Sequence, residues 1–167
     1  AHYRPATQRL DEQADTAIFA YPTKPILMLV ALTLSAMLLE GAGTDWSVIF
    51  MRDIFSTPPF ISGMAFALGA LSQFIVRFFA DRFVDQYGPE KITSYSVIAL
   101  GIGVILVTFA PLPLIALGGF VLLGAGNAVI FPLAISAAAQ RTDRPASVNV
   151  AAVAQLSFIV FLLAPPF

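Results

Sequence analysis

The sequence of 167 residues has no cysteine and only one histidine, His2. The absence of cysteine excludes disulfide bonds, thiol nucleophiles and cysteine-based metal sites. Because the single histidine lies in the polar N-terminal stretch, histidine-dependent catalysis and histidine-rich metal binding are excluded too. The sequence therefore indicates no metal and no cofactor.

Charge is also scarce. Charged residues make up 11% of the chain, against about 25% in soluble domains, whereas hydrophobic residues make up 58%. The formal net charge is −1, so no basic surface is available to attract nucleic acid. With a mean hydropathy of +0.84, a water-soluble fold would lack the charge to cover its surface. We therefore expect the partner of this surface to be membrane lipid.

The spacing of the charges predicts five membrane spans. A helix needs about 20 apolar residues to cross a bilayer, and residues 54–76 and 146–167 each carry no charge. The 49 uncharged residues 92–140 are too many for one span, and Pro111 and Pro113 divide them. The apolar runs do not alternate with polar residues as barrel strands do, so the fold class is an all-α membrane protein. The predicted spans are about 26–51, 58–80, 92–110, 113–140 and 146–167.

Lysine and arginine predict the orientation, since cytoplasmic connections carry the excess. The leading segment, the second connection and the fourth connection hold eight of these residues, whereas the first holds only Arg52 and the third none. We therefore expect the N-terminal segment, residues 1–24, to be a cytoplasmic linker. The chain begins with Ala1 and stops within an apolar run, which indicates a fragment of a longer protein.

Two acidic residues interrupt the first span. An ionisable side chain in hydrocarbon costs at least about 2.5 kcal/mol, so Glu40, roughly 21 Å along a helix from Ile26, indicates a cavity or a partner. Asp45 lies closer to the outer boundary. Glu40 has two interpretations: a substrate or proton site, or a hydrogen bond that fastens two helices. Gly41 and Gly43 beside it would loosen the helix locally.

Further polar residues lie in the later spans. Gln73, Asn127 and Gln155 are candidates for the same pathway, and Asn127 could equally make a structural bond between helices. Pro132 leaves a backbone carbonyl without its helical donor and can kink the fourth span. Gly124 and the nearby Gly126 favour close helix packing.

The connection between the second and third predicted spans carries a recognisable pattern. It resembles the loop signature of the major facilitator superfamily, in which an Asp, a Gly three residues later and a basic residue link consecutive helices on the cytoplasmic side. Asp85, Gly88 and Lys91 match this pattern, and Asp81 with Arg82 looks like a longer version. The segment Glu40 to Ser47 is similar to the seventh helix of bacterial sugar, fucose and rhizopine-type permeases. We expect a cytoplasmic gating loop made of Arg77, Asp81, Arg82, Asp85, Gly88 and Lys91.

The resemblance implies the second half of a twelve-helix secondary transporter of the bacterial inner membrane, whose partner is the missing N-terminal half of the same chain. Such a protein moves a small-molecule solute by alternating access through a site near the membrane midplane. The implied solute is polar and sugar-like, with possible proton coupling, and the implied activity is not enzymatic. A channel or a structural membrane subunit remains the alternative, and solute countertransport would separate it from a carrier.

Overall fold

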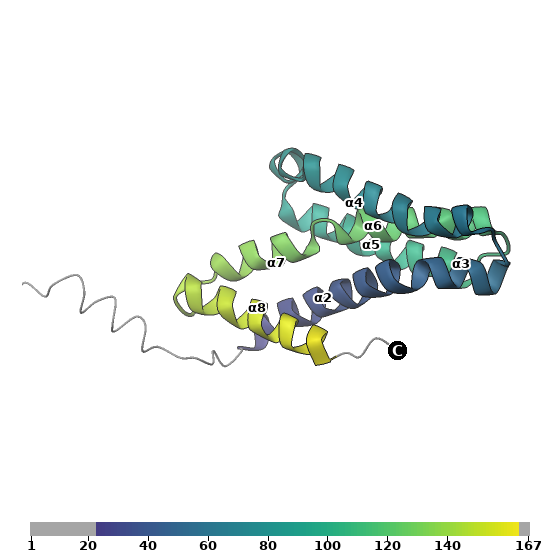
Figure 1. The fold of residues 1–167 in the computed structure, drawn as a ribbon. Coiled ribbons are helices and arrows are strands. Elements are labelled where there is room, and N and C mark those ends of the chain that lie inside the picture. The colour runs from purple at the N-terminus through teal and green to yellow at the C-terminus, as the bar shows by residue number, and fades with distance from the viewer. Residues whose placement is uncertain (1–22, 164–167) are drawn as a thin grey trace, which may run out of the picture.

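The computed structural model of the protein describes residues 23–163. Over these residues the chain forms five helical rods and no strand, which confirms the all-α class (Figure 1). The rods comprise α2 (Lys24–Gly41), the π-helical turn η1 (Ala42–Trp46) and α3 (Ser47–Phe55); α4 (Pro59–Tyr87); α5 (Pro89–Thr108); α6 (Pro113–Asn127) and α7 (Ile130–Ala139); and α8 (Ala146–Leu163). The predicted linker, except for its last two residues, and the end of the fifth predicted span lie outside the described residues.

Prolines and two unusual backbone conformations determine where the rods begin and end. Pro59, Pro89 and Pro113 each stand at the first position of a helix, where the missing N–H costs nothing. Gly88 alone separates α4 from α5, with a φ of 84° that favours glycine. Ser56 ends α3 in the left-handed region at a φ of 52°.

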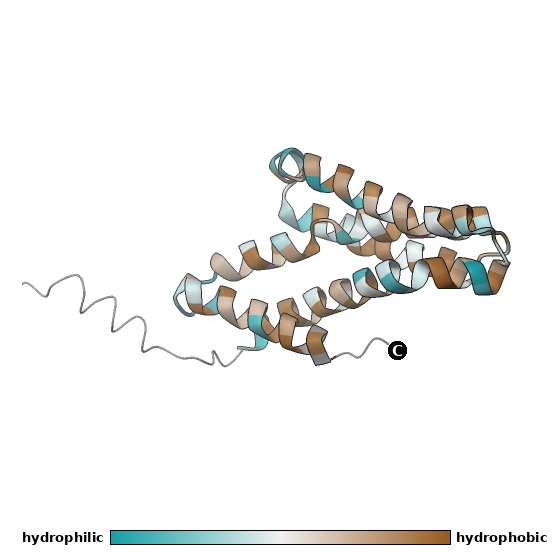
Figure 2. Cartoon of the chain, viewed as in Figure 1, coloured by the Kyte–Doolittle hydropathy of each residue, from teal (hydrophilic) through white to brown (hydrophobic). Residues whose placement is uncertain are grey.

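The outer surface of the rods is apolar, as expected for contact with lipid. Large side chains such as Phe60, Phe78 and Phe109 are more than 70% exposed, and apolar residues cover the length of the helices (Figure 2). Over residues 23–163, four of the helical rods are long and apolar enough to cross a membrane, and the apolar helix Ala146–Ile159 is shorter. An exposed apolar surface of this extent marks a membrane interface rather than a soluble surface.

The rods pack in two groups that share the helix pair α6 and α7. At one end, α6 packs on α4 and α5, with Met51, Ala65 and Phe120 in the core. At the other end, α7 packs on α2 and α8 around Ile26 and Val153. Glu40 lies where α2 passes from one group to the other.

Glycines allow the close approach of α6 to its neighbours. A Cβ at Gly124 would stand 2.1 Å from the carbonyl oxygen of Gly69 in α4, and a Cβ at Gly126 would stand 2.7 Å from that of Ser96 in α5. The close-packing role expected for Gly124 and Gly126 is therefore confirmed. These contacts hold α4, α5 and α6 together as a scaffold for the polar residues between α2, α4 and α6.

Candidate functional site

Glu40 occupies the penultimate position of α2, immediately before an irregular turn. The π turn η1 follows Gly41. Such turns are rare in proteins overall, and those that occur are often found at functional sites. The Thr44 hydroxyl donates to the carbonyl oxygens of Glu40 and Gly41 at 3.0 Å each. The helix thus loosens where Gly41 and Gly43 predicted it.

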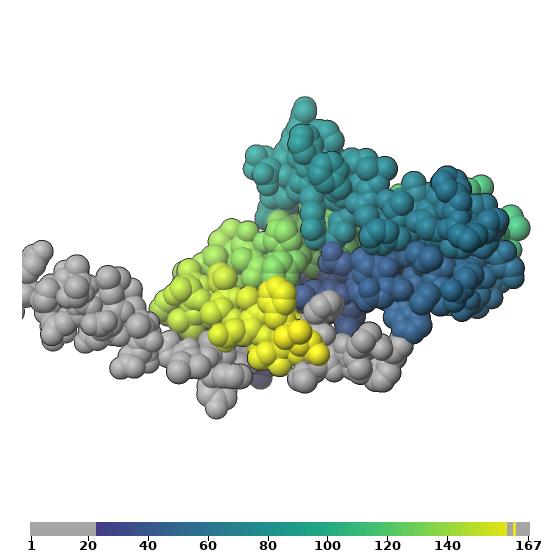
Figure 3. All heavy atoms as spheres, viewed as in Figure 1, coloured from purple at the N-terminus to yellow at the C-terminus, as the bar shows by residue number. Residues whose placement is uncertain are grey.

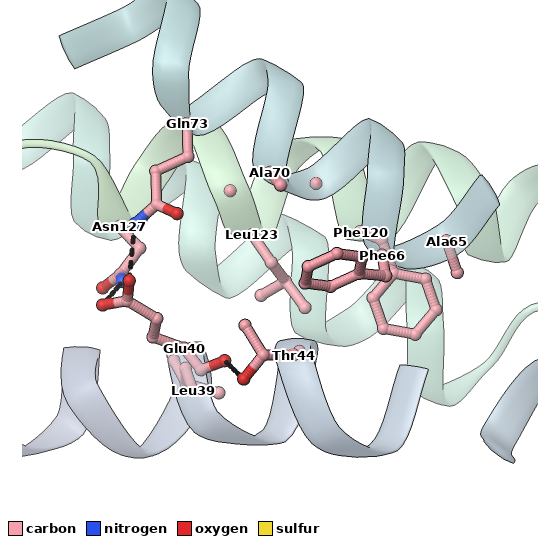
Figure 4. A pocket seen from close by; sticks show the side chains of 13 residues that line it. Leu39, Glu40, Thr44, Ala65, Phe66, Ala70, Gln73, Phe120, Leu123 and Asn127 are labelled. Carbon is pink, nitrogen blue, oxygen red and sulfur yellow. Dashed lines mark hydrogen bonds between the residues drawn. The ribbon is translucent and has the colours of Figure 1, made fainter. Parts of the chain in front are cut away.

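Side chains from three helices meet at the Glu40 carboxylate (Figure 4). Gln73 of α4 donates from Nε2 to Glu40 Oε1 at 2.9 Å, and Asn127 of α6 donates from Nδ2 to Glu40 Oε2 at 2.8 Å. Arg77 of α4 places Nη2 3.8 Å from Glu40 Oε1. The structure therefore brings together three of the five predicted pathway residues and adds a cation that offsets the carboxylate charge.

Spare hydrogen-bonding capacity remains at this cluster. Asn127 is only 5% exposed, yet its Oδ1 has no hydrogen-bond partner among the described residues. The Glu40 side chain is 38% exposed, so the carboxylate is open on one side. A buried polar atom without a partner usually receives water or a ligand. The unpaired Asn127 oxygen marks this face as one that can accept a hydrogen bond from a further molecule.

A small pocket lies beside the cluster, with a volume of about 50 Å³. Glu40, Gln73 and Asn127 form its polar part, whereas Phe66 and Phe120 form part of its apolar wall. A water molecule needs roughly 10–15 Å³ of such space, so the pocket has room for a few waters. A larger solute would need additional surface from outside the described residues.

The sequence did not single out Phe66 and Phe120 for this pocket. Apolar side chains of the same types also cover the lipid-facing surface, so residue type alone carries no signal for a pocket lining. Their position became apparent only from the packing of α4 against α6.

Asp45 and Gln155, the other two predicted pathway residues, do not join the cluster. Asp45 lies in η1 with an exposed side chain and has no hydrogen bond or ion pair within residues 23–163. Gln155 is exposed on α8, and this helix contacts α2 through a different residue, Ser157, whose hydroxyl is 2.6 Å from that of Thr33. The structure separates both residues from Glu40.

The predicted gating loop is mostly helical, which corrects the expectation of a loop. Helix α4 continues to Tyr87, so Arg77, Asp81, Arg82 and Asp85 are helical residues, and Lys91 lies in the first turn of α5. Only Gly88 lies outside the two helices, because its positive φ reverses the chain in a single residue. The predicted span ended at residue 80 because the apolar segment ends there. Charged residues can also form a helix, so α4 continues beyond the apolar segment to Tyr87.

Three of these charged residues face a common cleft. Arg77, Asp81 and Asp85 follow one another at four-residue spacing, which places them on one face of α4. With residues of α7 they line a cleft of about 570 Å³, and in Figure 3 the teal atoms of this part of the chain rise above the green atoms of α7. Arg82 and Lys91 are not among the residues that line it.

The Arg77 side chain is half-exposed, and its guanidinium group contacts groups on two neighbouring helical rods. Its Nε donates to the carbonyl oxygen of Ala128 at 3.0 Å, while its Nη2 lies near Glu40. Pro132 was the available sequence signal, because it lacks the N–H that would otherwise serve the Ala128 carbonyl. The predicted freeing of a carbonyl by Pro132 thus coincides with the contact made by Arg77.

A second polar cluster ties the start of α2 to the α7–α8 connection. Asp143 accepts hydrogen bonds from the Thr23 hydroxyl at 3.1 Å and from Asn149 Nδ2 at 3.0 Å, and Arg141 Nε lies 3.5 Å away. Burial alone would raise the pKa of Asp143, but these hydrogen bonds and the Arg141 charge outweigh it and lower the pKa. The ionised carboxylate therefore stabilises this junction.

Comparison with known proteins identifies the family of this chain and several similar proteins. The sequence profile of the Major Facilitator Superfamily matches residues 5–166. The chain is 27% identical over 92% of its length to an uncharacterized MFS-type transporter of Yersinia pestis and covers 40% of that protein. It is 26% identical over 86% of its length to an uncharacterized transporter of Sinorhizobium fredii, and 26% identical over 84% to the membrane protein MosC of Rhizobium meliloti, covering 38% and 35% of them.

The chain thus spans about two fifths of the length of these relatives. No solved structure matches it.

Proposed function

Because this chain belongs to the Major Facilitator Superfamily, we propose that it forms most of the second half of a secondary transporter that carries a small polar solute by alternating access. The family match bears out the resemblance seen in the sequence, and together with the apolar helices it supports a multi-pass membrane protein of a transporter family. The solute, the coupling ion and the transport cycle are the proposal. The observation that carries it is the convergence of Gln73, Arg77 and Asn127 on Glu40 between otherwise apolar helices.

The cluster suits a solute-binding or proton-binding role better than a purely structural one. A bond that only fastened the helices would need one donor and one acceptor, whereas Glu40 receives two amide donors and lies near a cation. The unpaired Asn127 oxygen and the exposed part of the Glu40 carboxylate leave acceptors for solute hydroxyl groups or a proton. In our proposal Glu40 binds the solute or takes up the coupled proton.

The remaining surface of the site comes from the rest of the protein in this proposal. The relatives are more than twice as long as this chain, which leaves length for a preceding half. The partner half would close the exposed side of Glu40 and enlarge the pocket, as expected for a site between two halves. The excess of lysine and arginine supports a cytoplasmic position for the N-terminal segment and the Gly88 turn, and in this proposal the membrane is the bacterial inner membrane.

Solute countertransport tests this function. The full-length protein would be reconstituted in proteoliposomes loaded with one unlabelled solute at a time from a panel of hexoses, polyols and amino acids. The same solute, radiolabelled, is then added outside in trace amount. A carrier gives a transient internal accumulation of label above equilibrium, because each outward-moving solute returns the site for an inward one.

A channel or a structural subunit gives only passive equilibration or no flux. Absence of countertransport with every solute of the panel, in vesicles that contain correctly folded protein, would contradict the proposed carrier function. Chemical conversion of a solute during the assay would indicate an enzyme instead.

A further inference from the structure

The fourth rod breaks at a buried position between α6 and α7. Helix α6 ends at Asn127 and α7 begins at Ile130, and the intervening Ala128 and Val129 are 0% and 3% exposed. Pro132 has no N–H to donate to the carbonyl of Ala128, four residues earlier. A buried carbonyl needs a donor from elsewhere, above all in a membrane where no water competes.

Arg77 is that donor, and its guanidinium group also forms an ion pair with Glu40. Its Nε lies 3.0 Å from the Ala128 carbonyl oxygen, and its Nη2 lies 3.8 Å from Glu40 Oε1. The guanidinium group holds these donors in a fixed planar arrangement. A shift of the guanidinium toward one partner therefore changes its contact with the other.

The break also separates two hollow regions of the structure. Asn127, immediately before Ala128, donates to Glu40 and lines the small pocket. Ala128 and Pro132 line the cleft of about 570 Å³ between α4 and α7, together with Arg77. A movement of α7 about the break would thus alter the cleft on one side and the Asn127 contact with Glu40 on the other.

We propose that Arg77 is a positioning residue that replaces the helical donor lost at Pro132 and thereby links the charge state and occupancy of Glu40 to the angle between α6 and α7. When Glu40 is neutral or engaged by a solute, Arg77 is held less firmly on that side and its hold on the Ala128 carbonyl changes. The inference rests on the proposed function in one respect, namely that Glu40 is the site where the solute or proton binds.

The test measures the cleft directly and needs no solute. One spin label is attached at Y87C, the last residue of α4, and the other at Q140C, the residue that follows α7, and both positions are exposed. Pulsed electron paramagnetic resonance then measures the separation of these two helix ends. The full-length protein in lipid nanodiscs is used, with other cysteines replaced. The variants are Arg77→Met, Pro132→Ala, Glu40→Gln and their combinations.

Arg77→Met removes every donor while keeping side-chain length, so we expect the population with a changed α4–α7 distance to rise about fivefold, within the range of ordinary couplings between sites. Pro132→Ala restores the N–H that serves Ala128 and should return the Arg77→Met variant to the parent distribution. Glu40→Gln should shift the distribution only when Arg77 is present. Arg52→Gln, an exposed arginine paired with Asp53, is the control and should leave the distances unchanged.

Three results would overturn the inference: parent-like distances in Arg77→Met, no restoration by Pro132→Ala, or an equal effect of Glu40→Gln with and without Arg77. If Arg77→Met fails to fold, folding of the double variant with Pro132→Ala supports the donor role, and its failure refutes that role. These outcomes are independent of countertransport. Loss of the distance coupling in a protein that countertransports contradicts the inference alone, and intact coupling without countertransport contradicts the carrier function alone.

Discussion

Helix α6 presents two contrasting surfaces. Toward α4 and α5 it offers glycines, and Gly124 and Gly126 bring its backbone against the backbones of its neighbours. Toward α2 it offers Asn127, which reaches a half-exposed carboxylate and keeps one oxygen unpaired. The first surface has no space to spare, whereas the second has spare space and spare hydrogen-bonding capacity.

The glycine surface of α6 acts as a scaffold, whereas the surface with Asn127 belongs to the proposed binding site. Backbone contact through glycines fixes the distance between helices, because no side chain can rearrange to absorb a change. A polar pocket tolerates side-chain substitution more readily, and substitutions there alter chemistry before they alter the fold. The following predictions test this separation.

The largest loss of stability is expected at the glycine contact. Gly124→Ala places a methyl group 2.1 Å from the Gly69 carbonyl oxygen, so the two helices must move apart. We expect a loss of about 3 kcal/mol or more in the free energy of unfolding, at the upper end for overpacking. Thermal unfolding of the full-length protein in detergent measures it. Gly118→Ala in the same helix, with open space around it, is the control, and equal stability of the two variants would refute the scaffold interpretation.

An intermediate effect is expected from deleting hydrogen bonds on the two surfaces. Asn127→Ala removes a donor to Glu40, and Ser72→Ala removes a donor to the Val121 carbonyl, a bond of 2.6 Å between α4 and α6. Each should cost about 1 kcal/mol of stability. Only Asn127→Ala should lower the initial rate of solute countertransport, by about tenfold or more, since a bond to a charged group is lost. Similar rates in the two variants would show that Asn127 is merely structural.

The smallest effect is expected at the Asp143 junction, outside both surfaces. Because the pKa of Asp143 is lowered in the folded protein, the ionised group adds stability above its ordinary pKa of about 4, and this contribution is lost as the pH falls through the lowered value. The unfolding temperature of the parent should exceed that of Asp143→Asn at pH 6, with the difference shrinking toward pH 3. A constant difference for Asp143→Asn would contradict the assigned hydrogen bonds.

The sequence predicted the helices of the scaffold better than the contacts around Glu40. Apolar runs determine helices with little dependence on tertiary contacts. In the structure α6 begins at Pro113, where the fourth span was predicted to begin, whereas α5 begins at Pro89, three residues before the predicted residue 92. Glu40 was recognisable because an ionisable group in hydrocarbon is costly wherever its partners lie.

The partners of Glu40 were harder to predict. Arg77 belongs to a helix that continues beyond the apolar segment, so its charge resembled that of a surface loop until α4 and α6 were placed together. Gln155 has the same chemistry as Gln73, but α8 faces a different part of α2. Which polar residues meet depends on helix rotation and packing, and a single sequence leaves both open.

The central claim is that Glu40 binds the solute or takes up the coupled proton, and does not serve only as a hydrogen-bond acceptor that holds the helices together. The most direct measurement compares countertransport and solute-driven proton uptake by the full-length parent and Glu40→Gln in proteoliposomes with equal amounts of protein. The account predicts that Glu40→Gln inserts and folds like the parent and loses solute-driven proton uptake. Unchanged uptake with unchanged pH dependence would contradict it.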